Sequence, residues 1–225
     1  MYPPFAPAPP PVVTQHVVST PPADEPFTLD EGKLLAGADW VAGDPREPLM
    51  TAWIAAARDQ AERDTRLPLL TQTIDLALTG VPVAQMPVWR VEWSGPTWSA
   101  SQATIALVRA PGRLQAVSWV QYLDANGATQ TLDPSQYQVD LLRGTVTPTT
   151  GAWPSTQIAI RYTAGWATPA DLKAAVPLLV HAVGLLVAHY ATLGRDIGVI
   201  ERGALMVVPQ SYTDAIAAFQ PVTVA

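Results

Sequence analysis

The sequence predicts an α+β protein: a small helical bundle with an inserted antiparallel β region and extended terminal arms. Two changes of periodicity support this prediction. Apolar residues recur every three or four positions near both ends of the chain, which is typical of helices. Between residues 71 and 164 the period falls to two, which is typical of half-buried strands. We therefore divide the chain into a Pro-rich N-terminal arm (1–26), the first helices (27–70), the β region (71–166), the last helices (167–220) and a C-terminal tail (221–225).

The first 26 residues hold nine of the chain's 23 prolines. Repeated proline removes backbone donors and favours an extended path. Such a segment is either a disordered tail or an arm held by a neighbouring subunit, because an extended Pro-rich arm is rarely held by its own domain. Tyr2 and Phe5 are the candidate contact residues of this arm.

Two helices are predicted after the arm. Residues 28–31, Thr-Leu-Asp-Glu, have the form of a capping box, and Gly37 is expected to end the short helix that follows. A longer helix is predicted from residue 46 or 47 to residue 66, with Glu62 and Arg66 as an i, i+4 ion pair on its exposed side. Its apolar residues share one face: Leu49, Met50, Trp53, Ile54, Ala57 and Ala61.

Several short strands are predicted in the β region. Ile74, Leu76 and Leu78 alternate with less apolar residues, and further candidates cover residues 88–93, 103–109, 114–123, 136–142 and 157–163. Asn126-Gly127 predicts a type I′ hairpin turn, because this pair accommodates two positive φ angles.

The last helices begin where Thr168 and Pro169 give an N-cap and a first helical residue. The helix is predicted to reach residue 193, with Pro177 kinking or dividing it. Residues 174–191 are apolar enough for a membrane span, but two histidines, Pro177 and the lack of a basic flank favour a helix buried on several faces. A final helix is predicted from Ser211 as N-cap to Pro221.

The composition argues against several classes of function. Charged residues make up only 14% of the chain, against about 25% in an average protein, so we expect part of its surface to be buried against partners. A net charge of -6 argues against an electrostatic grip on DNA or on an anionic membrane. The N-terminus lacks the basic and continuous apolar regions of a signal peptide, which predicts synthesis in the cytoplasm.

We find no pattern that indicates catalysis. The chain has no cysteine, and therefore no disulfide, thiolate nucleophile or Cys-type zinc site. His181 and His189 are eight residues apart on one helix, which turns them roughly 80° from each other, so we expect structural histidines and no metal site. No nucleophile elbow, phosphate-binding loop or dinucleotide fingerprint is present. We therefore expect no enzyme and no cofactor.

Trp89, Trp93 and Trp98 form an aromatic group within the β region. Trp89 and Trp93 are four residues apart, so they lie on one face of a strand, as Val91 does. The group predicts either a core or subunit contact, where tryptophan is enriched, or a β module that binds carbohydrate or another ligand.

The order of the predicted pieces resembles the head-to-tail connector (adaptor) family of long-tailed phages and prophages. Five stretches carry the likeness and together span about 190 residues: FTLDEGKLLAG, PLMTAWIAAARDQAERDTRLPLLTQTIDLALTG, VSWVQYLDANGATQTLDPSQYQVDL, IAIRYTAGWATPADLKAAVPLLVHAVGLLVAHYATLGRD and VPQSYTDAIAAF. The Pro-rich arm before Phe27 and the Trp-rich stretch of residues 89–111 depart from the family's pattern.

This resemblance implies a ring of usually twelve subunits in the neck of a virion, at the head–tail interface. The ring would join the portal protein to a stopper or tail-completion protein, and packaged DNA would pass through it without specific binding. An acidic subunit suits a conduit that releases DNA. A tail-terminator or head-completion subunit is the alternative within the same class.

A cyclic ring needs two different contact patches on each subunit. The candidate subunit-interface residues lie on the two long predicted helices: Trp53, Ala57, Val183, Val187 and Tyr190. The candidate portal-docking residues lie in and after the final helix: Tyr212, Ile216, Phe219, Val222 and Val224. Deletion of residues 212–225 is accordingly expected to leave a folded subunit that no longer joins portal rings.

Overall fold

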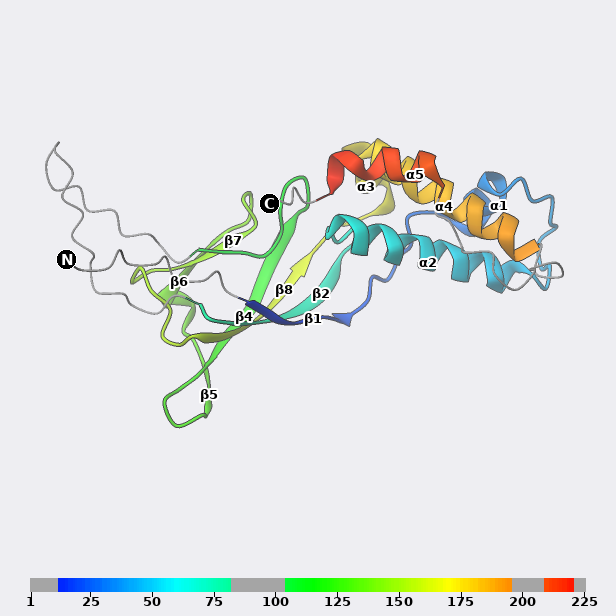
Figure 1. Ribbon diagram of the computed structural model, residues 1–225. Coiled ribbons are helices and arrows are strands. Elements are labelled where there is room, and N and C mark those ends of the chain that lie inside the picture. The colour runs from blue at the N-terminus through cyan, green and yellow to red at the C-terminus, as the bar shows by residue number, and fades with distance from the viewer. Residues whose placement is uncertain (1–11, 82–103, 196–208, 221–225) are drawn as a thin grey trace, which may run out of the picture. The chain divides into compact units, whose positions relative to one another are not determined.

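The computed structural model describes residues 12–81, 104–195 and 209–220, and it confirms the α+β class (Figure 1). The chain forms two compact units. Among the described residues, the sheet unit holds 12–21, 72–81 and 104–164, and the helical unit holds 22–71, 165–195 and 209–220. Each unit is therefore assembled from segments that are distant in the sequence.

The helical unit contains α1 (Leu29–Leu35), α2 (Glu47–Thr65), α3 (Pro169–Ala175), α4 (Pro177–Arg195), α5 (Gln210–Ile216) and a 3₁₀ turn, η2 (Ala217–Phe219). The sheet unit contains β1 (Val12–Thr20), β2 (Gln72–Thr79), β3 (Ile105–Ala106), β4 (Leu114–Leu123), β5 (Thr129–Thr131), β6 (Tyr137–Asp140), β7 (Thr145–Pro148), β8 (Gln157–Ala164) and a 3₁₀ turn, η1 (Pro134–Gln136).

The predicted capping box at the start of α1 is confirmed. The Thr28 hydroxyl accepts from the Glu31 backbone N–H at 3.2 Å, and the Glu31 carboxylate accepts from the Thr28 N–H at 2.8 Å. Both groups satisfy backbone donors that the helix leaves without partners. Gly37, with φ of 57°, follows the C-cap residue Ala36 as predicted.

The apolar face of α2 is narrower than the sequence predicts. Met50, Ile54, Ala57 and Ala61 are buried as expected, but Leu49 is exposed. The predicted ion pair of Glu62 with Arg66 is replaced, because Arg66 has turned into the left-handed conformation that ends the helix. Glu62 instead accepts from the Arg58 guanidinium at 3.0 Å and from the Leu69 N–H at 2.8 Å.

Pro177 divides the predicted third helix, as expected. α3 ends at Ala175, and the axes of α3 and α4 differ by 115°. α4 runs through Gly194 to Arg195, two residues beyond its predicted end. The final helix begins at Gln210 with Pro209 at the cap position, so Ser211 lies in the first turn and does not cap it.

The core of the helical unit forms where α4 packs against α2, α5 and α1. The nearly all-round apolar sequence of α4 predicts a helix that is buried on several sides. The structure confirms this prediction, since α4 has neighbours on several sides. The tight turn into this unit requires a glycine: Gly165 has φ of 115°, and a Cβ there would lie 2.2 Å from the Leu70 carbonyl oxygen. Trp166 then exchanges backbone hydrogen bonds with Leu69 and Thr71.

The main sheet of the other unit has five antiparallel strands in the order β1-β2-β8-β4-β5. β2 and β8 are central, and every second side chain of each is buried. On the opposite face, Asp75 accepts two hydrogen bonds from the Arg161 guanidinium at 2.7 Å, and Arg161 lies over the Trp119 ring. The alternation predicted from Ile74, Leu76 and Leu78 is therefore confirmed.

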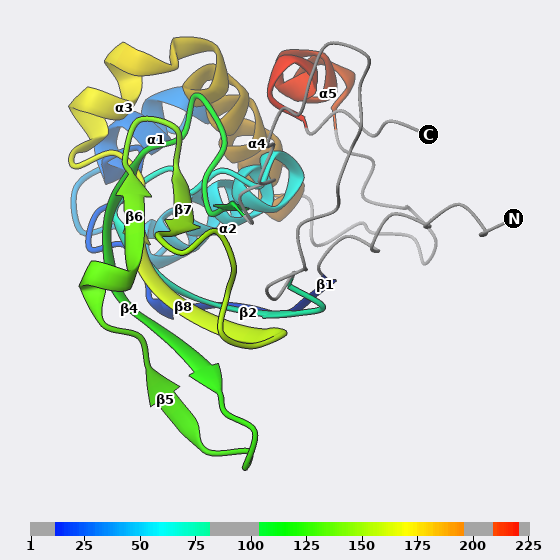
Figure 2. The ribbon, with the colours of Figure 1, turned by 90° about the vertical axis from the view of Figure 1, so that its left-hand side faces the viewer.

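A second sheet of three strands, in the order β3-β7-β6, shares its core with the inner face of the main sheet. Tyr137 and Val146 come from this small sheet, and Ile160 and Tyr162 come from the main one. Figure 2 shows β6 and β7 beside β4 and β8, with the β4–β5 hairpin projecting from the unit. The strand predicted at residues 88–93 lies outside the described residues.

The β4–β5 hairpin does not contain the predicted type I′ turn. Only Gly127 has a positive φ, of 77°, whereas Asn126 does not. The Gly127 N–H donates to the Asp124 carbonyl, and the Asp124 N–H donates to the Ala128 carbonyl. The Asp124 carboxylate also accepts from the Asn126 and Ala128 N–H groups, which stabilises the longer loop. A turn that ends in a left-handed glycine is the next most common hairpin connection.

The segment predicted as the N-terminal arm contributes a strand to its own domain. β1 pairs with β2 from Val12 to Thr20, with bulges at Thr14 and Ser19. A partner subunit is therefore not needed to hold residues 12–20. Their β-branched residues favour a strand, and the prolines that dominate the arm lie on either side of it.

Candidate assembly surfaces

The described residues contain no cluster that indicates catalysis or metal binding. Within this part of the chain, no three His, Asp or Glu side chains are placed to hold a metal ion. His181 is exposed and His189 is partly buried, and both lie on α4 without a shared ligand position. Taken alone, none of the described helices has the length and apolarity of a membrane span; α3 and α4 reach them only as a bent pair. The candidate functional sites among the described residues are therefore surfaces that could bind partner proteins.

The candidate subunit-interface residues divide into two groups. Ala57, Val183 and Val187 are fully buried in the core of the helical unit, so they present no surface in the folded chain. Trp53 and Tyr190 are partly exposed at the edge of that core. Periodicity finds an apolar face but does not distinguish a face that packs within the chain from one that packs between chains.

The candidate portal-docking residues divide in the same way. Tyr212 and Ile216 belong to the core, and the Tyr212 hydroxyl donates to the Asp64 carboxylate at 2.7 Å. Burial, with this hydrogen bond, raises the pKa of Tyr212 far above its ordinary value. Phe219 is partly buried against the same core. Val222, Val224, Tyr2 and Phe5 lie outside the described residues, as do Trp89, Trp93 and Trp98.

These contacts correct the expected effect of deleting residues 212–225. The deletion would remove three buried core residues (Tyr212, Ala215 and Ile216) and the hydrogen bond to Asp64, so it would destabilise the helical unit as well as any docking surface. Residues 221–225, which follow η2, include the docking candidates Val222 and Val224 and none of these core side chains.

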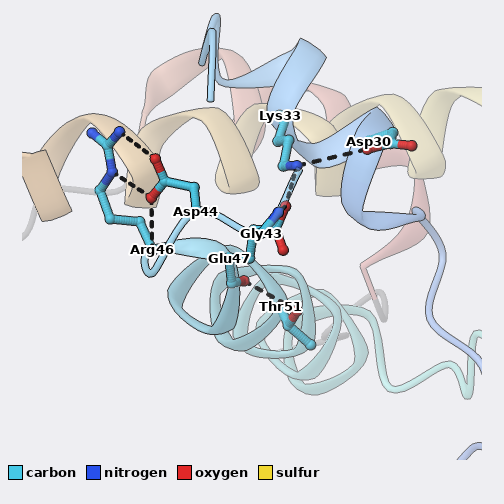
Figure 3. Close-up of polar contacts among 7 residues, drawn as sticks. All are labelled: Asp30, Lys33, Gly43, Asp44, Arg46, Glu47 and Thr51. Carbon is cyan, nitrogen blue, oxygen red and sulfur yellow. Dashed lines mark hydrogen bonds and ion pairs between the residues drawn. The ribbon is translucent and has the colours of Figure 1, made fainter. Parts of the chain in front are cut away.

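A polar network fixes the corner between α1 and α2 (Figure 3). Lys33, which is buried, donates to the Glu47 carboxylate at 2.5 Å, and the Gly43 N–H donates to the same oxygen at 3.1 Å. Asp30 adds a longer ion pair to Lys33 at 3.8 Å. The hydrogen bond with Glu47 raises the pKa of Lys33 and, reciprocally, lowers the pKa of Glu47. Both groups are therefore charged, and they tie the loop to both helices.

The same corner holds a second ion pair. The Arg46 guanidinium donates twice to the Asp44 carboxylate, at 2.9 and 2.8 Å, and lowers the pKa of Asp44 to about 2. Arg46 also lies 4.5 Å from the centre of the Trp40 ring, and Trp40 in turn contacts Trp53 at 6.4 Å between ring centres. The partly exposed Trp53 is thus part of an ordered aromatic corner.

Exposed apolar side chains surround this ordered corner. Leu34 is 82% exposed, Val41 is 77% exposed and Leu49 is 51% exposed, and each belongs to α1, the connecting loop or α2. Exposed apolar residues on a rigid frame are typical of protein–protein contact sites, because the frame loses little conformational freedom on binding. We name these three residues, with Trp40 and Trp53, the corner surface.

Among its described residues, the sheet unit exposes several apolar side chains together in two places. One is β1, in which no residue is buried. The other is the β6–β7 turn, where Leu141 and Leu142 are exposed beside a shallow hollow of about 620 Å³ lined also by Thr104, Val139 and Arg143. Sequence reasoning missed both features, although the β-branched run of residues 12–20 and the Leu-Leu pair were available signals.

No protein-family model and no curated protein matches the chain. Among solved structures, the fold is similar to a chain of the "Neck of empty GTA particle computed with C6 symmetry", with a TM-score of 0.61 and 20% identity over 94% of this chain and 98% of that one. A chain of the "Virion of native gene transfer agent (GTA) particle" has a TM-score of 0.61 and 18% identity over the same shares. A chain of the "Neck of native GTA particle computed with C12 symmetry" has a TM-score of 0.50 and 19% identity over 90% and 96%. At these identities the likeness is one of fold.

Proposed function

We propose that the chain is a structural subunit in the neck of a phage-like particle: an adaptor that forms a ring between the portal and the tail. The observation that carries the proposal is the shared fold. It extends over 94% of this chain and 98% of a chain from a neck structure, so the likeness includes the helical unit, the sheet unit and their order in the sequence. The cyclic symmetries of the two neck structures, C6 and C12, favour a ring of twelve subunits.

Charge and exposure agree with this role. A subunit that lines or surrounds a DNA channel must let phosphate pass, and a net charge of -6 repels it. A cyclic contact uses two different patches on each subunit, and the corner surface and β1 are two exposed apolar features on different units of the chain. The role requires no cofactor, no metal and no catalytic residue.

Other contacts of the ring follow from the same proposal. Phe219, Val222 and Val224 remain candidate portal-docking residues, and Tyr2 and Phe5 remain candidate arm contacts. A stopper or tail-completion protein would occupy the other side of the ring. The particle's neck is accordingly the proposed location of the chain.

The test is the mass of the purified full chain by light scattering, alone and after mixing with portal rings from the same particle. A ring that forms alone or on the portal supports the proposal. A monomer that ignores the portal overturns it. A ring that binds the tail tube and not the portal would instead favour a tail-terminator.

Deletion of residues 221–225 separates docking from folding. The variant should keep the thermal unfolding profile of the full chain but lose binding to portal rings. A Ser211→Ala variant, changed at an exposed position of α5, is the matched control and should bind as the unaltered chain does. Unchanged portal binding by the deletion would remove Val222 and Val224 from the docking surface.

A further inference from the structure

Within the described part of the sheet unit, β1 is an edge strand with one side of its backbone open. It pairs with β2 and with no other described strand, and it is the first strand in the order of the main sheet. Alternate N–H and C=O groups of an edge strand point away from the sheet and are available to another strand. The bulge residues are held by their side chains, since the Thr14 hydroxyl donates to the Ala77 carbonyl and the Ser19 hydroxyl donates to the Thr73 carbonyl. Between them, residues 15–18 keep a regular register.

This edge lacks the charges that usually protect an exposed strand. Natural edge strands carry lysine, proline or inward-pointing charges that prevent pairing with other chains. Residues 12–20, Val-Val-Thr-Gln-His-Val-Val-Ser-Thr, contain no Lys, Arg, Asp, Glu or Pro. The two bulges shorten the regular stretch, but they add no charge to it.

The exposed valines of β1 lie on both faces of the sheet. Val13 and Val18 are opposite Leu78 and Ile74, which point to the inner face, whereas Val17 is opposite Asp75 on the outer face. Val13, Val17 and Val18 are 55%, 46% and 42% exposed. A helix or a second sheet would cover only one of these faces. A strand added in the plane of the sheet would contact side chains on both.

A second copy of this chain is the partner that the proposed ring places beside each subunit. Identical subunits of net charge -6 repel each other, so contact between them is least opposed where the surface is uncharged. β1 offers such a surface together with open backbone hydrogen-bonding groups. In a cyclic ring each copy meets the next through a different patch, so β1 would pair with another segment of the neighbour and not with the neighbour's own β1.

We propose that β1 of each subunit accepts a strand from the adjacent copy, so that backbone pairing at this edge joins the subunits of the ring. The inference deepens the proposed function and rests on it. Photocrosslinking tests the proposal. The photoreactive residue p-benzoylphenylalanine replaces Val17 in the full chain, which is then assembled alone or on portal rings. Irradiation followed by a denaturing gel should give a ladder of dimers, trimers and larger multimers of this chain, because each copy reacts with the next.

The same photoreactive residue in place of Asn126, at the exposed tip of the β4–β5 hairpin, is the matched control and should give no ladder. Dimers without larger products from the Val17 position would show two-fold pairing of β1 with itself and would overturn the proposal. Crosslinks to the portal alone, or rings without crosslinks, would overturn it while leaving the ring function intact. Failure to form rings under either condition would overturn both.

A lysine in place of Val17 tests the edge without a crosslinker. Val17→Lys places the ammonium beside Asp75 on the outer face, so the single subunit should keep its thermal unfolding temperature. Ring formation should be lost at the protein concentration at which the unaltered chain assembles, because a charge at the edge opposes strand addition. Asn126→Lys carries the same change of charge and should assemble normally. Normal rings of Val17→Lys would contradict the proposal.

Discussion

α4 of the helical unit and β1 of the sheet unit differ in how completely they bury their apolar residues. α4 has α1, α2 and α5 as neighbours, and most of its apolar side chains are buried within the chain, although Leu178 is 47% exposed. In the sheet unit, β2 buries every second side chain, whereas its partner β1 buries none. The apolar residues of α4 therefore stabilise the core, whereas those of β1 form an exposed surface at the edge of the sheet. Substitutions on the two sides of this contrast should therefore differ in their effect on stability.

Tyr212→Ala should have the largest effect. Tyr212 is 1% exposed, fills the core between α5 and its neighbours, and donates a hydrogen bond to Asp64. Truncating a large buried aromatic residue costs about 3–5 kcal/mol of the free energy of unfolding. Denaturant unfolding followed by circular dichroism measures the loss. The neighbouring exposed substitution Thr213→Ala should change the free energy by less than about 0.5 kcal/mol.

Leu76→Ala should destabilise the sheet unit by about 2–3 kcal/mol, near the lower end of the range for buried leucine. Leu76 lies on β2 opposite His16 of β1, and this exposed neighbour can relax into part of the space. Val17→Ala on β1 should cost less than about 0.5 kcal/mol, because the side chain is already half exposed. Equal losses from the two substitutions would contradict the contrast between the central strand and the edge strand.

Acid should weaken the helical unit through its ion pairs. Hydrogen bonds from Lys173, Arg46 and Lys33 lower the pKa values of Glu31, Asp44 and Glu47, respectively. A carboxylate whose pKa is lowered by folding stabilises the fold above its ordinary pKa, and that contribution is lost as the pH falls through the lowered value. The contribution of these ion pairs to the thermal unfolding temperature should therefore be complete above about pH 5 and be lost between about pH 4 and pH 2. Asp44→Asn should reduce this acid sensitivity; an unchanged pH profile would exclude the pair with Arg46 as its source.

Lys33→Met should have a smaller effect than the core truncations. It removes one of the two hydrogen bonds to the Glu47 carboxylate and leaves that charge with the Gly43 N–H. Lys173→Met breaks the comparable pair with Glu31, but the Lys173 side chain is 34% exposed against 9% for Lys33. Water replaces an exposed partner more readily, so Lys33→Met should lower the unfolding temperature more than Lys173→Met. A reversed order would contradict the burial argument.

Local sequence signals predicted local structure well. The Thr28 capping box, the Thr168 N-cap, the break at Pro177 and the alternation through Leu76 all depend on residues within one or two helical turns, and all are present. The type I′ turn at Asn126 was wrong because the Asp124 side chain stabilises a longer loop through two backbone N–H groups. Such competition between a side chain and a turn type is not visible in a dipeptide signal.

Composition and periodicity were enough for the α+β class, the order of the helices and the lack of any motif that indicates catalysis, but they missed the strand β1. Only the tertiary structure decided which apolar residues are free to meet a partner. Val183 and Val17 are the same residue type in apolar segments, yet one is fully buried and the other is half exposed. Periodicity records which side chains share a face, and burial depends on which distant segment covers that face. α4 has neighbours on several sides, whereas β1 has β2 on one side of its backbone and an open edge on the other.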